Sequence, residues 1–179
     1  MALSPDEVKA MYKRLSPTQE DIDVIMYDKI IQTKDLANLI GKKAIIFYPA
    51  MNYGNITMGH YIALLFGDPT NQLMFYDPLA YKPDEYKKFT NRRLYRERTN
   101  TLVEHLLKHQ REGYTIDYNN HQHQSRKSSV ETCGRHCIIR CLLSDYNNAN
   151  YNRILKQLDH ARAIPTGKLR DSLIEELTQ

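Results

Sequence analysis

The sequence predicts an α+β fold in which a central mixed β-sheet is flanked by helices, and two observations lead to this class. Segments with helical hydrophobic spacing stand at both ends of the chain, and short runs rich in isoleucine, phenylalanine, tyrosine and leucine lie between them. Hydrophobic residues make up 41% and charged residues 26% of the 179 residues, which is the balance of a globular protein. We expect a single domain over 1–179, with N-terminal helices in 1–42, a core in 43–146 and C-terminal helices in 147–179.

The N-terminal region contains two helix-start patterns, "SPDE" at 4–7 and "SPTQ" at 16–19. In each pattern a serine can cap the helix, a proline takes the first helical position, and an acid or amide follows three residues after the serine. These patterns predict helices over 5–15 and 17–31, and a further short helix is expected over 33–40.

Three apolar segments predict the strands at the centre of the sheet: "KAIIFYPA" (43–50), "GHYIALLFG" (59–67) and "NQLMFYDPL" (71–79). The second and third segments are joined by the turn-forming residues "GDPTN". We therefore expect the sheet to contain a β-hairpin over 59–79.

The second half of the chain returns to helical spacing. Leucines recur at positions 94, 102, 106 and 107 between charged residues, which predicts an amphipathic helix over 91–110 that ends before Gly113. The remaining expected elements are a strand at 114–118, a polar loop at 119–132 and helices over 133–146, 151–163 and 166–179.

The charge of the chain is mildly basic, because 25 lysines and arginines face 21 acidic residues and give a net charge of +4. Two basic segments, 86–98 and 121–129, are either solvated surface or a site that attracts a polyanion such as DNA. The residues that would carry salt-sensitive polyanion binding are Lys87, Lys88, Arg92 and Arg93.

The sequence gives no sign of membrane insertion or secretion. No apolar run approaches the roughly 20 residues that span a bilayer, and the N-terminal residues lack the apolar stretch of a signal peptide. The three cysteines, spaced by four along one predicted helix, suit reduced thiols better than a disulfide framework. We expect the protein in the cytoplasm, or in a particle assembled there.

One of the three cysteines is a candidate nucleophile. Cys133 begins a predicted helix, with Thr132 before it as a cap and Gly134 after it without a Cβ to block approach. A thiol at this place feels the positive end of the helix dipole, which favours the reactive thiolate. Cys137 and Cys141 lie one and two turns further along the same helix face, among isoleucines and leucines, and are expected to fill the core.

His60 and Asp77 are candidates for the base and acid that a cysteine nucleophile requires. His60 opens the strand "GHYIALLF", and Asp77 follows the next strand in "FYDPL". Pairing of these strands in a hairpin would bring the two side chains together at one end of the sheet. A carboxylate there would hold the imidazole in one tautomer and stabilise its charged form.

The order "GHYIALLF", "LMFYDPLA", a glutamine-bearing loop and "TCGRHC" resembles the adenain-like cysteine peptidases, which include the adenovirus maturation protease and the SUMO- and NEDD8-specific proteases. The resemblance covers residues 59–143. It implies a papain-like or adenain-like fold in which the nucleophile lies at the N-terminus of a core helix. In this family tryptophan usually follows the histidine, where this chain has Tyr61.

The resemblance also implies a role for each matched residue. Cys133 corresponds to the nucleophile, His60 to the base, Asp77 to the acid, and Gln124 or Gln122 to the side chain that stabilises the oxyanion. The family's glutamine usually precedes the cysteine by six or seven residues, whereas Gln124 precedes Cys133 by nine, since 133 − 124 = 9.

The function that the resemblance implies is hydrolysis of peptide bonds by a Cys-His-Asp triad without a metal or other cofactor. The expected substrates are precursors of viral capsid or other structural proteins, cleaved during virion maturation in the host cytoplasm or in the virion. DNA or a peptide is an expected activator, because adenovirus-type enzymes use both. Deconjugation of ubiquitin- or SUMO-like proteins is the alternative within the family.

Two non-peptidase alternatives remain open from the sequence. Cys133, Cys137, Cys141 and His136 could bind zinc together with the histidines of "HQHQ" at 121–124, although closed sites normally draw ligands from two elements rather than one helix stripe. The other alternative is a capsid-associated protein that keeps the fold without the chemistry.

Overall fold

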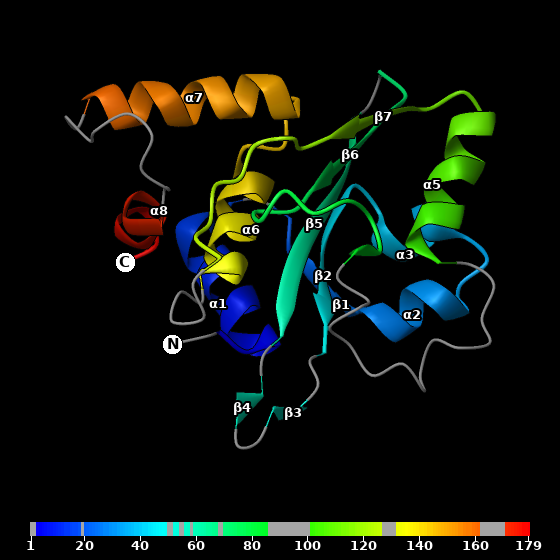
Figure 1. Ribbon diagram of the computed structural model, residues 1–179, viewed down its shortest axis with the longest axis horizontal. Helices are drawn as coiled ribbons and strands as arrows, with labels where there is room; N and C mark the ends of the chain where they lie inside the picture. Colours follow the sequence, from blue (N-terminus) through cyan, green and yellow to red (C-terminus); the bar gives the residue numbers. More distant parts are fainter. Residues whose placement is uncertain are drawn as a thin grey trace.

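A five-stranded mixed β-sheet forms the centre of the molecule (Figure 1). The computed structural model describes residues 3–18, 20–49, 52–53, 56–57, 59–67, 70–85, 101–126, 132–161 and 171–179. The strands of this sheet, in spatial order, are β1 (Asp23–Met26), β2 (Lys43–Tyr48), β5 (His60–Gly67), β6 (Gln72–Tyr76) and β7 (Thr115–Tyr118). A separate two-stranded ribbon consists of β3 (Asn52–Tyr53) and β4 (Ile56–Thr57).

The strand directions confirm both the mixed sheet and the predicted hairpin. The three central strands β2, β5 and β6 are antiparallel, whereas the edge strands β1 and β7 run parallel to their neighbours. In the hairpin, the pairs run from Gly67 opposite Gln72 to Ala63 opposite Tyr76. The start of β5 and the end of β6 therefore lie at the same end of the sheet.

Helices cover both faces of the sheet, so the described residues form three layers (Figure 1). One face packs against α1 (Pro5–Leu15), α6 (Cys133–Leu142), α7 (Asn148–Ala161) and α8 (Asp171–Leu177). The other face packs against α2 (Tyr27–Gln32), α3 (Leu36–Ile40) and α5 (Leu102–Arg111). None of the helices among the described residues is long and apolar enough to cross a membrane.

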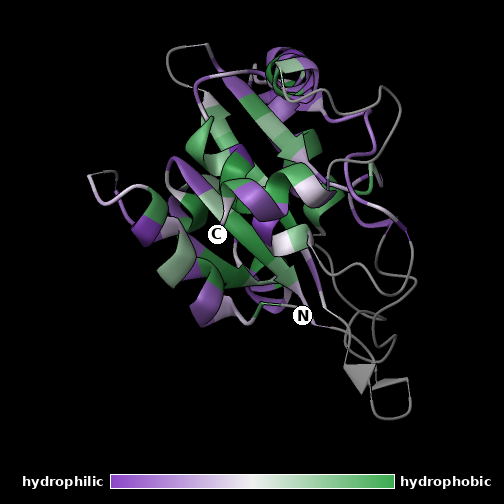
Figure 2. Cartoon of the chain, turned by 90° about the vertical axis from the view of Figure 1, so that its left-hand side faces the viewer, coloured by the Kyte–Doolittle hydropathy of each residue, from purple (hydrophilic) through white to green (hydrophobic). Residues whose placement is uncertain are grey.

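Strand β5 explains why the middle of the sequence is so continuously apolar. Tyr61, Ala63 and Leu65 point into the layer of α1 and α6, whereas Ile62 and Leu64 point into the layer of α2 and α5. A strand that is buried on both faces needs apolar residues at successive positions rather than at alternate ones. Figure 2 shows the resulting concentration of hydrophobic residues along the sheet and the inner sides of the helices.

The predicted helix over 17–31 is wrong before residue 27 and right from 27 to 31. Helix α1 ends at Leu15, because its C-cap Ser16 has a non-helical backbone, and residues 23–26 form the edge strand β1 beside β2. In this strand the successive residues Val24 and Ile25 pack on opposite faces of the sheet, which is the period-2 pattern of a strand. Pairing with β2 and burial on both sides therefore override the local cap pattern, and only 27–32 is helical.

Most other boundaries shift by a few residues. Helix α7 begins at Asn148 rather than at 151, because the side chain of Asn147 accepts a hydrogen bond from the Asn150 N–H at 2.8 Å and so acts as the cap. Helix α6 ends at Leu142 rather than at 146. The first part of the predicted helix 91–110, the basic residues of 86–98 and the residues 166–170 lie outside the described residues.

Candidate active site

His60 and Asp77 meet at the end of the β5–β6 hairpin, as the sequence predicted. Asp77 directly follows β6, and its Oδ2 lies 2.9 Å from Nε2 of His60. Both side chains are buried. The hairpin register produces this contact, because it places the first residue of β5 and the residue after β6 at the same end of the sheet.

The carboxylate of Asp77 is held on both sides. While Oδ2 faces His60, Oδ1 accepts a hydrogen bond from the Leu79 N–H at 2.7 Å. The Asp77 carbonyl accepts hydrogen bonds from the Ala80 N–H and from the side-chain amide of Asn119, at 2.9 and 2.7 Å. Such a network fixes the direction of the carboxylate and therefore the orientation of the imidazole.

Cys133 completes the group from the opposite element. It is the first residue of α6, and its side chain is hydrogen-bonded to His60. Because Nε2 of His60 faces Asp77, Nδ1 is the ring nitrogen available for a thiol. The structure thus brings Cys133, His60 and Asp77 into one continuous chain of contacts.

The neighbours of His60 in this group raise its pKa strongly. Burial alone would lower its pKa, but the charge of Asp77, the hydrogen bond to Asp77 and the contacts with Cys133 raise the pKa of His60 to about 10. The imidazole is therefore protonated at neutral pH. A protonated imidazole beside a cysteine at a helix N-terminus is the environment in which thiols react as thiolates.

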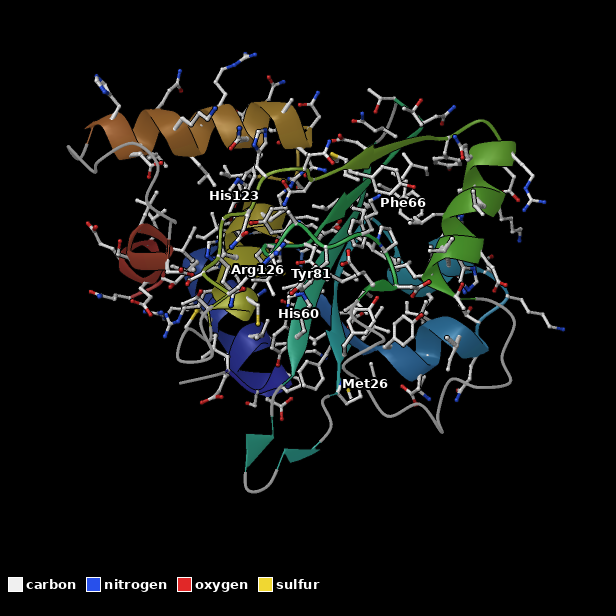
Figure 3. All side chains as sticks on the ribbon, viewed as in Figure 1. Met26, His60, Phe66, Tyr81, His123 and Arg126 are labelled. Atoms are coloured by element: carbon white, nitrogen blue, oxygen red, sulfur yellow. The ribbon has the colours of Figure 1, made fainter. Side chains whose placement is uncertain are left out.

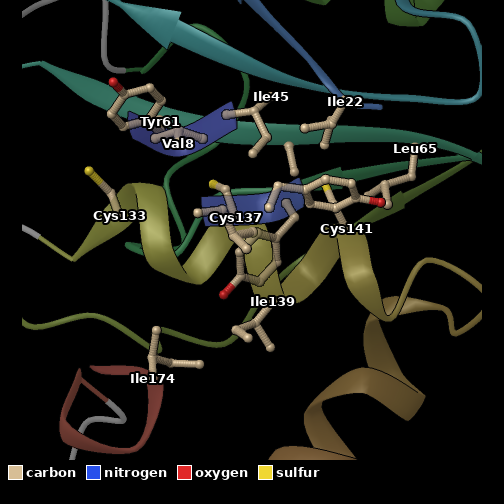
Figure 4. Packing of buried hydrophobic residues seen from close by; sticks show 14 of the residues in the cluster. Val8, Ile22, Ile45, Tyr61, Leu65, Cys133, Cys137, Ile139, Cys141 and Ile174 are labelled. Atoms are coloured by element: carbon tan, nitrogen blue, oxygen red, sulfur yellow. The ribbon is translucent and has the colours of Figure 1, made fainter. Parts of the chain in front are cut away.

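The other two cysteines are part of the core, as predicted. Cys137 and Cys141 are 0% exposed, whereas Cys133, the first residue of α6, is 7% exposed. Figure 4 shows the three cysteines along this helix. Burial raises the pKa of the Cys137 thiol well above its usual value and that of Cys141 to about 12. Of the three cysteines, Cys133 is the most exposed, and its side chain contacts the imidazole of His60.

Gly134 allows α6 to approach its neighbours closely. A Cβ at this position would lie 3.1 Å from Cγ2 of Val8 and 3.3 Å from Cδ2 of Tyr61. Tyr61, which stands where the resembling family has tryptophan, is buried in the same cluster and donates a hydrogen bond from its hydroxyl to the Leu3 carbonyl. Close packing of Gly134 on Tyr61 thus places the start of α6 beside the start of β5.

Thr132 occupies the cap position of α6, but its side chain does not cap the helix, contrary to the prediction. Its hydroxyl donates instead to Oδ1 of Asp171, the first residue of α8. Asp171 was not singled out by the sequence. It lies far from Cys133 along the chain, and no local pattern marks it.

The loop after β7 brings the candidate oxyanion donor to the Asp77 turn. The backbone N–H groups of His123 and Gln124 donate to the carbonyl of Pro78, which follows Asp77, at 2.8 and 2.9 Å. Gln124 is buried, whereas Gln122 is partly exposed and donates its side-chain amide to the carbonyl of Gln124. The Gln122 amide is therefore bound within its own loop.

An aromatic and a basic residue border the group. The ring of Tyr81 lies edge-on to His60, with centroids 6.5 Å apart, and the guanidinium of Arg126 lies 4.8 Å from the Tyr81 ring centroid. Arg126 also donates to the Leu79 carbonyl at 3.1 Å. Figure 3 shows these three residues close together at one end of the sheet.

The described residues contain no group of three or more histidine, cysteine, aspartate or glutamate side chains arranged to hold a metal ion. The candidate zinc ligands have other partners, since His136 bonds to Asp171, and Cys137 and Cys141 lie in the core. In the "HQHQ" segment, His123 is bound between Tyr76 and Asn152.

A pocket of about 780 Å³ lies away from this group. Its lining includes Gly67 and Gln72, at the opposite end of the β5–β6 hairpin from His60, and Lys43, at the same end of the neighbouring strand β2. The candidate site is therefore a buried histidine–aspartate pair beside the Cys133 thiol, and it is separate from this pocket.

Comparison with known proteins yields an informative similarity. The chain is 27% identical over 128 residues to a protein of Sputnik virophage named "Uncharacterized protein V9", and the match covers 68% of this chain and 67% of that protein. No protein-family model matches the chain, and no solved structure matches it. The similarity supports a viral origin for the chain.

Proposed function

We propose that this protein is a cysteine peptidase in which Cys133 is the nucleophile, His60 the general acid and base, and Asp77 the residue that orients His60. The observation that carries the proposal is the position of His60, with one ring nitrogen 2.9 Å from Asp77 and the side chain of Cys133 hydrogen-bonded to the same ring. A nucleophile, a base and an orienting acid in contact are the arrangement of covalent acyl-transfer enzymes.

The reaction follows from this geometry. The thiolate of Cys133 attacks the carbonyl carbon of a peptide bond, and the negative charge develops on the carbonyl oxygen. The C–N bond then breaks as the imidazolium of His60 gives its proton to the departing amine, which leaves a thioester on Cys133. Water, deprotonated by His60, attacks the thioester, and the proton returns to the His60–Cys133 pair as the carboxylic acid leaves.

Two donors would stabilise the oxyanion in both steps. The backbone N–H of Cys133 belongs to the first turn of α6, where N–H groups have no acceptor within the helix. The side-chain amide of Gln124 is the second donor. A single donor of this kind contributes about a hundredfold to a thousandfold in rate.

The substrates that we propose are protein precursors of a virus particle, capsid proteins first. The similarity to a virophage protein supports this choice, because a virus encodes few proteins and a peptidase among them acts on partners made in the same host cell. Activation by DNA or by a peptide belongs to the same proposal. In this proposal DNA binds to the basic residues of 86–98, which the structure does not describe.

The test is cleavage of a peptide library derived from whole-cell protein, with new peptide ends identified by mass spectrometry. The wild-type protein should generate ends that Cys133→Ala does not, and Cys141→Ala should generate the same ends as wild type because Cys141 is buried in the core. Capsid proteins of the same virus and ubiquitin-like conjugates are then compared as substrates. Equal sets of ends from wild type and Cys133→Ala would refute the proposal.

A further inference from the structure

Asp171 joins three parts of the chain through one carboxylate. Its Oδ2 accepts a hydrogen bond from the Ser125 N–H at 2.8 Å, and its Oδ1 accepts from the Thr132 hydroxyl and lies 3.2 Å from Nε2 of His136. The Asp171 side chain is 17% exposed. The carboxylate thus lies largely inside the molecule, with both oxygens engaged.

Two of these partners flank the proposed oxyanion donors. Ser125 directly follows Gln124, and Thr132 directly precedes Cys133. Each donor, the Gln124 side chain and the Cys133 N–H, is therefore one residue away from a hydrogen bond to Asp171. Because both bonds end on the same carboxylate, they set the distance between the two ends of segment 125–132.

The charge on Asp171 strengthens these bonds. Burial would raise its pKa, but hydrogen bonds from His136, Thr132 and Ser125 hold the pKa of the carboxyl below its ordinary value. The group is therefore ionised at neutral pH, and hydrogen bonds to an ionised acceptor are roughly twice as strong as neutral ones.

Helix α8 is attached to the molecule by other contacts as well. Leu173 and Ile174 are buried against the core, and Thr178 accepts hydrogen bonds from Arg135 and, through its carbonyl, from Arg14. Removal of the Asp171 carboxylate alone should therefore leave α8 docked on α1 and α6. A substitution of Asp171 therefore tests the carboxylate and not the docking of α8.

We propose that Asp171 is a positioning residue of the peptidase site, which holds Gln124 and the Cys133 N–H at the separation that an oxyanion requires. The inference rests on the proposed function. A displacement of about 1 Å at such donors is enough to reduce the rate of the chemical step about a hundredfold, and it has little influence on the binding of substrate residues far from the carbonyl.

The test compares Asp171→Ala and Asp171→Asn with wild type in a peptide-cleavage assay. We expect kcat to fall about tenfold to a hundredfold in Asp171→Ala, with KM within about twofold of wild type. Asp171→Asn keeps one acceptor oxygen but not the charge, and should lose less activity. The double variant Gln124→Ala/Asp171→Ala should lose less than the product of the two single losses, because both act on the same oxyanion.

Asp84→Ala is the matched control. Asp84 also accepts a backbone N–H and a hydroxyl, from Val103 and Tyr27, but it does so at the start of α5 on the other side of the sheet. This variant should lower the melting temperature and leave kcat unchanged. If Asp171→Ala lowers only the melting temperature, or if its loss multiplies fully with that of Gln124→Ala, Asp171 has no positioning role.

The pH dependence of Cys133 alkylation distinguishes failure of this inference from failure of the proposed function. Asp171 bonds to neither His60 nor Asp77 among the described contacts, so Asp171→Ala should keep the fast alkylation of Cys133 at low pH. A wild-type protein without that fast reaction would overturn the proposed function and this inference together. Normal alkylation with an unchanged kcat in Asp171→Ala would overturn the inference alone.

Discussion

At the scale of single residues, the candidate site depends on how His60 is held. Its ring lies between a buried carboxylate and a thiol, and it is removed from water on all sides. The two partners differ, since the charge of Asp77 raises the pKa of His60, whereas Cys133 is the proposed nucleophile. The residue-scale predictions therefore separate these roles.

Replacement of Asp77 by asparagine tests the orienting acid. The amide can still contact His60, but it removes the negative charge that raises the pKa of that residue. We expect kcat to fall about a hundredfold or more, as is usual when general acid–base catalysis is lost, and the pKa of His60 to fall. NMR titration of the His60 ring measures the pKa. An unchanged pKa in Asp77→Asn would mean that Asp77 does not keep His60 charged.

The two glutamines of the loop give a matched pair of variants. Gln124→Ala should lower kcat about a hundredfold, because it removes an oxyanion donor. Gln122→Ala removes a side chain that bonds within its own loop, and should keep kcat within a few-fold of wild type. The reverse ranking in a peptide-cleavage assay would assign the oxyanion role to Gln122.

The raised pKa of His60 makes stability depend on pH. The folded-state pKa, about 10, exceeds the ordinary value of 6.5, so the folded protein holds this proton more tightly than the unfolded chain. The resulting stability is fully present below pH 6.5 and is lost as the pH rises through about 10. We expect the free energy of unfolding of wild type, measured with urea, to fall over this range relative to that of His60→Ala. Parallel curves for the two proteins would contradict the raised pKa.

Residues near one another in the hairpin could be paired from the sequence alone. Because the turn fixes the register, His60 and Asp77 follow from the positions of two neighbouring strands. Thr132 was misassigned because a threonine before a helix is usually its cap, and the competing acceptor on Asp171 comes from a distant helix. Local patterns thus identified the residues that meet in the candidate site and missed Asp171, which bonds to Ser125 and Thr132.

At the scale of elements, the same limit explains the error over 17–31. The start of α1 was predicted correctly, because its capping box is local: Ser4 and Glu7 bond to each other's backbone. Strand β1 depends on β2, which lies about twenty residues further along the chain, and on helices that cover both faces. The hydrophobic residues of 22–26 suit either structure until that partner is known.

Arg140 links the elements that follow the nucleophile. Its fully buried guanidinium donates to Asn148 at the start of α7 and to the carbonyls of Leu143 and Tyr146 in the intervening turn. Arg140→Met leaves these acceptors without their donor, and should reduce the free energy of unfolding by about 2–4 kcal/mol.

The exposed Arg111, at the end of α5, provides the control for this prediction. Its side chain bonds to the Leu107 carbonyl of its own helix, so Arg111→Met should change the free energy of unfolding by less than about 0.5 kcal/mol. Urea unfolding followed by circular dichroism measures both values. Equal stabilities of the two variants would mean that the buried guanidinium does not hold α6 and α7 together.

At the scale of the whole molecule, the site is assembled from four distant regions: the β5–β6 hairpin, the loop after β7, the start of α6 and the start of α8. The central sheet aligns the first three, and α8 connects the second to the third through Asp171. The sequence predicted the α+β class and the meeting of His60 with Asp77, since these follow from local patterns and strand order. It could not predict contacts made by a helix at the end of the chain.

The alkylation rate of each cysteine, measured by mass spectrometry from about pH 5 to about pH 9, is the most direct test of the proposed pairing of Cys133 with His60. The wild-type protein is compared with His60→Ala. We predict that Cys133 alone reacts fast below neutral pH, that it loses this advantage without His60, and that the buried Cys137 and Cys141 stay slow in both proteins. Equally slow reaction of all three cysteines, or their joint protection until a chelator is added, would contradict the claim that Cys133 and His60 form a catalytic pair.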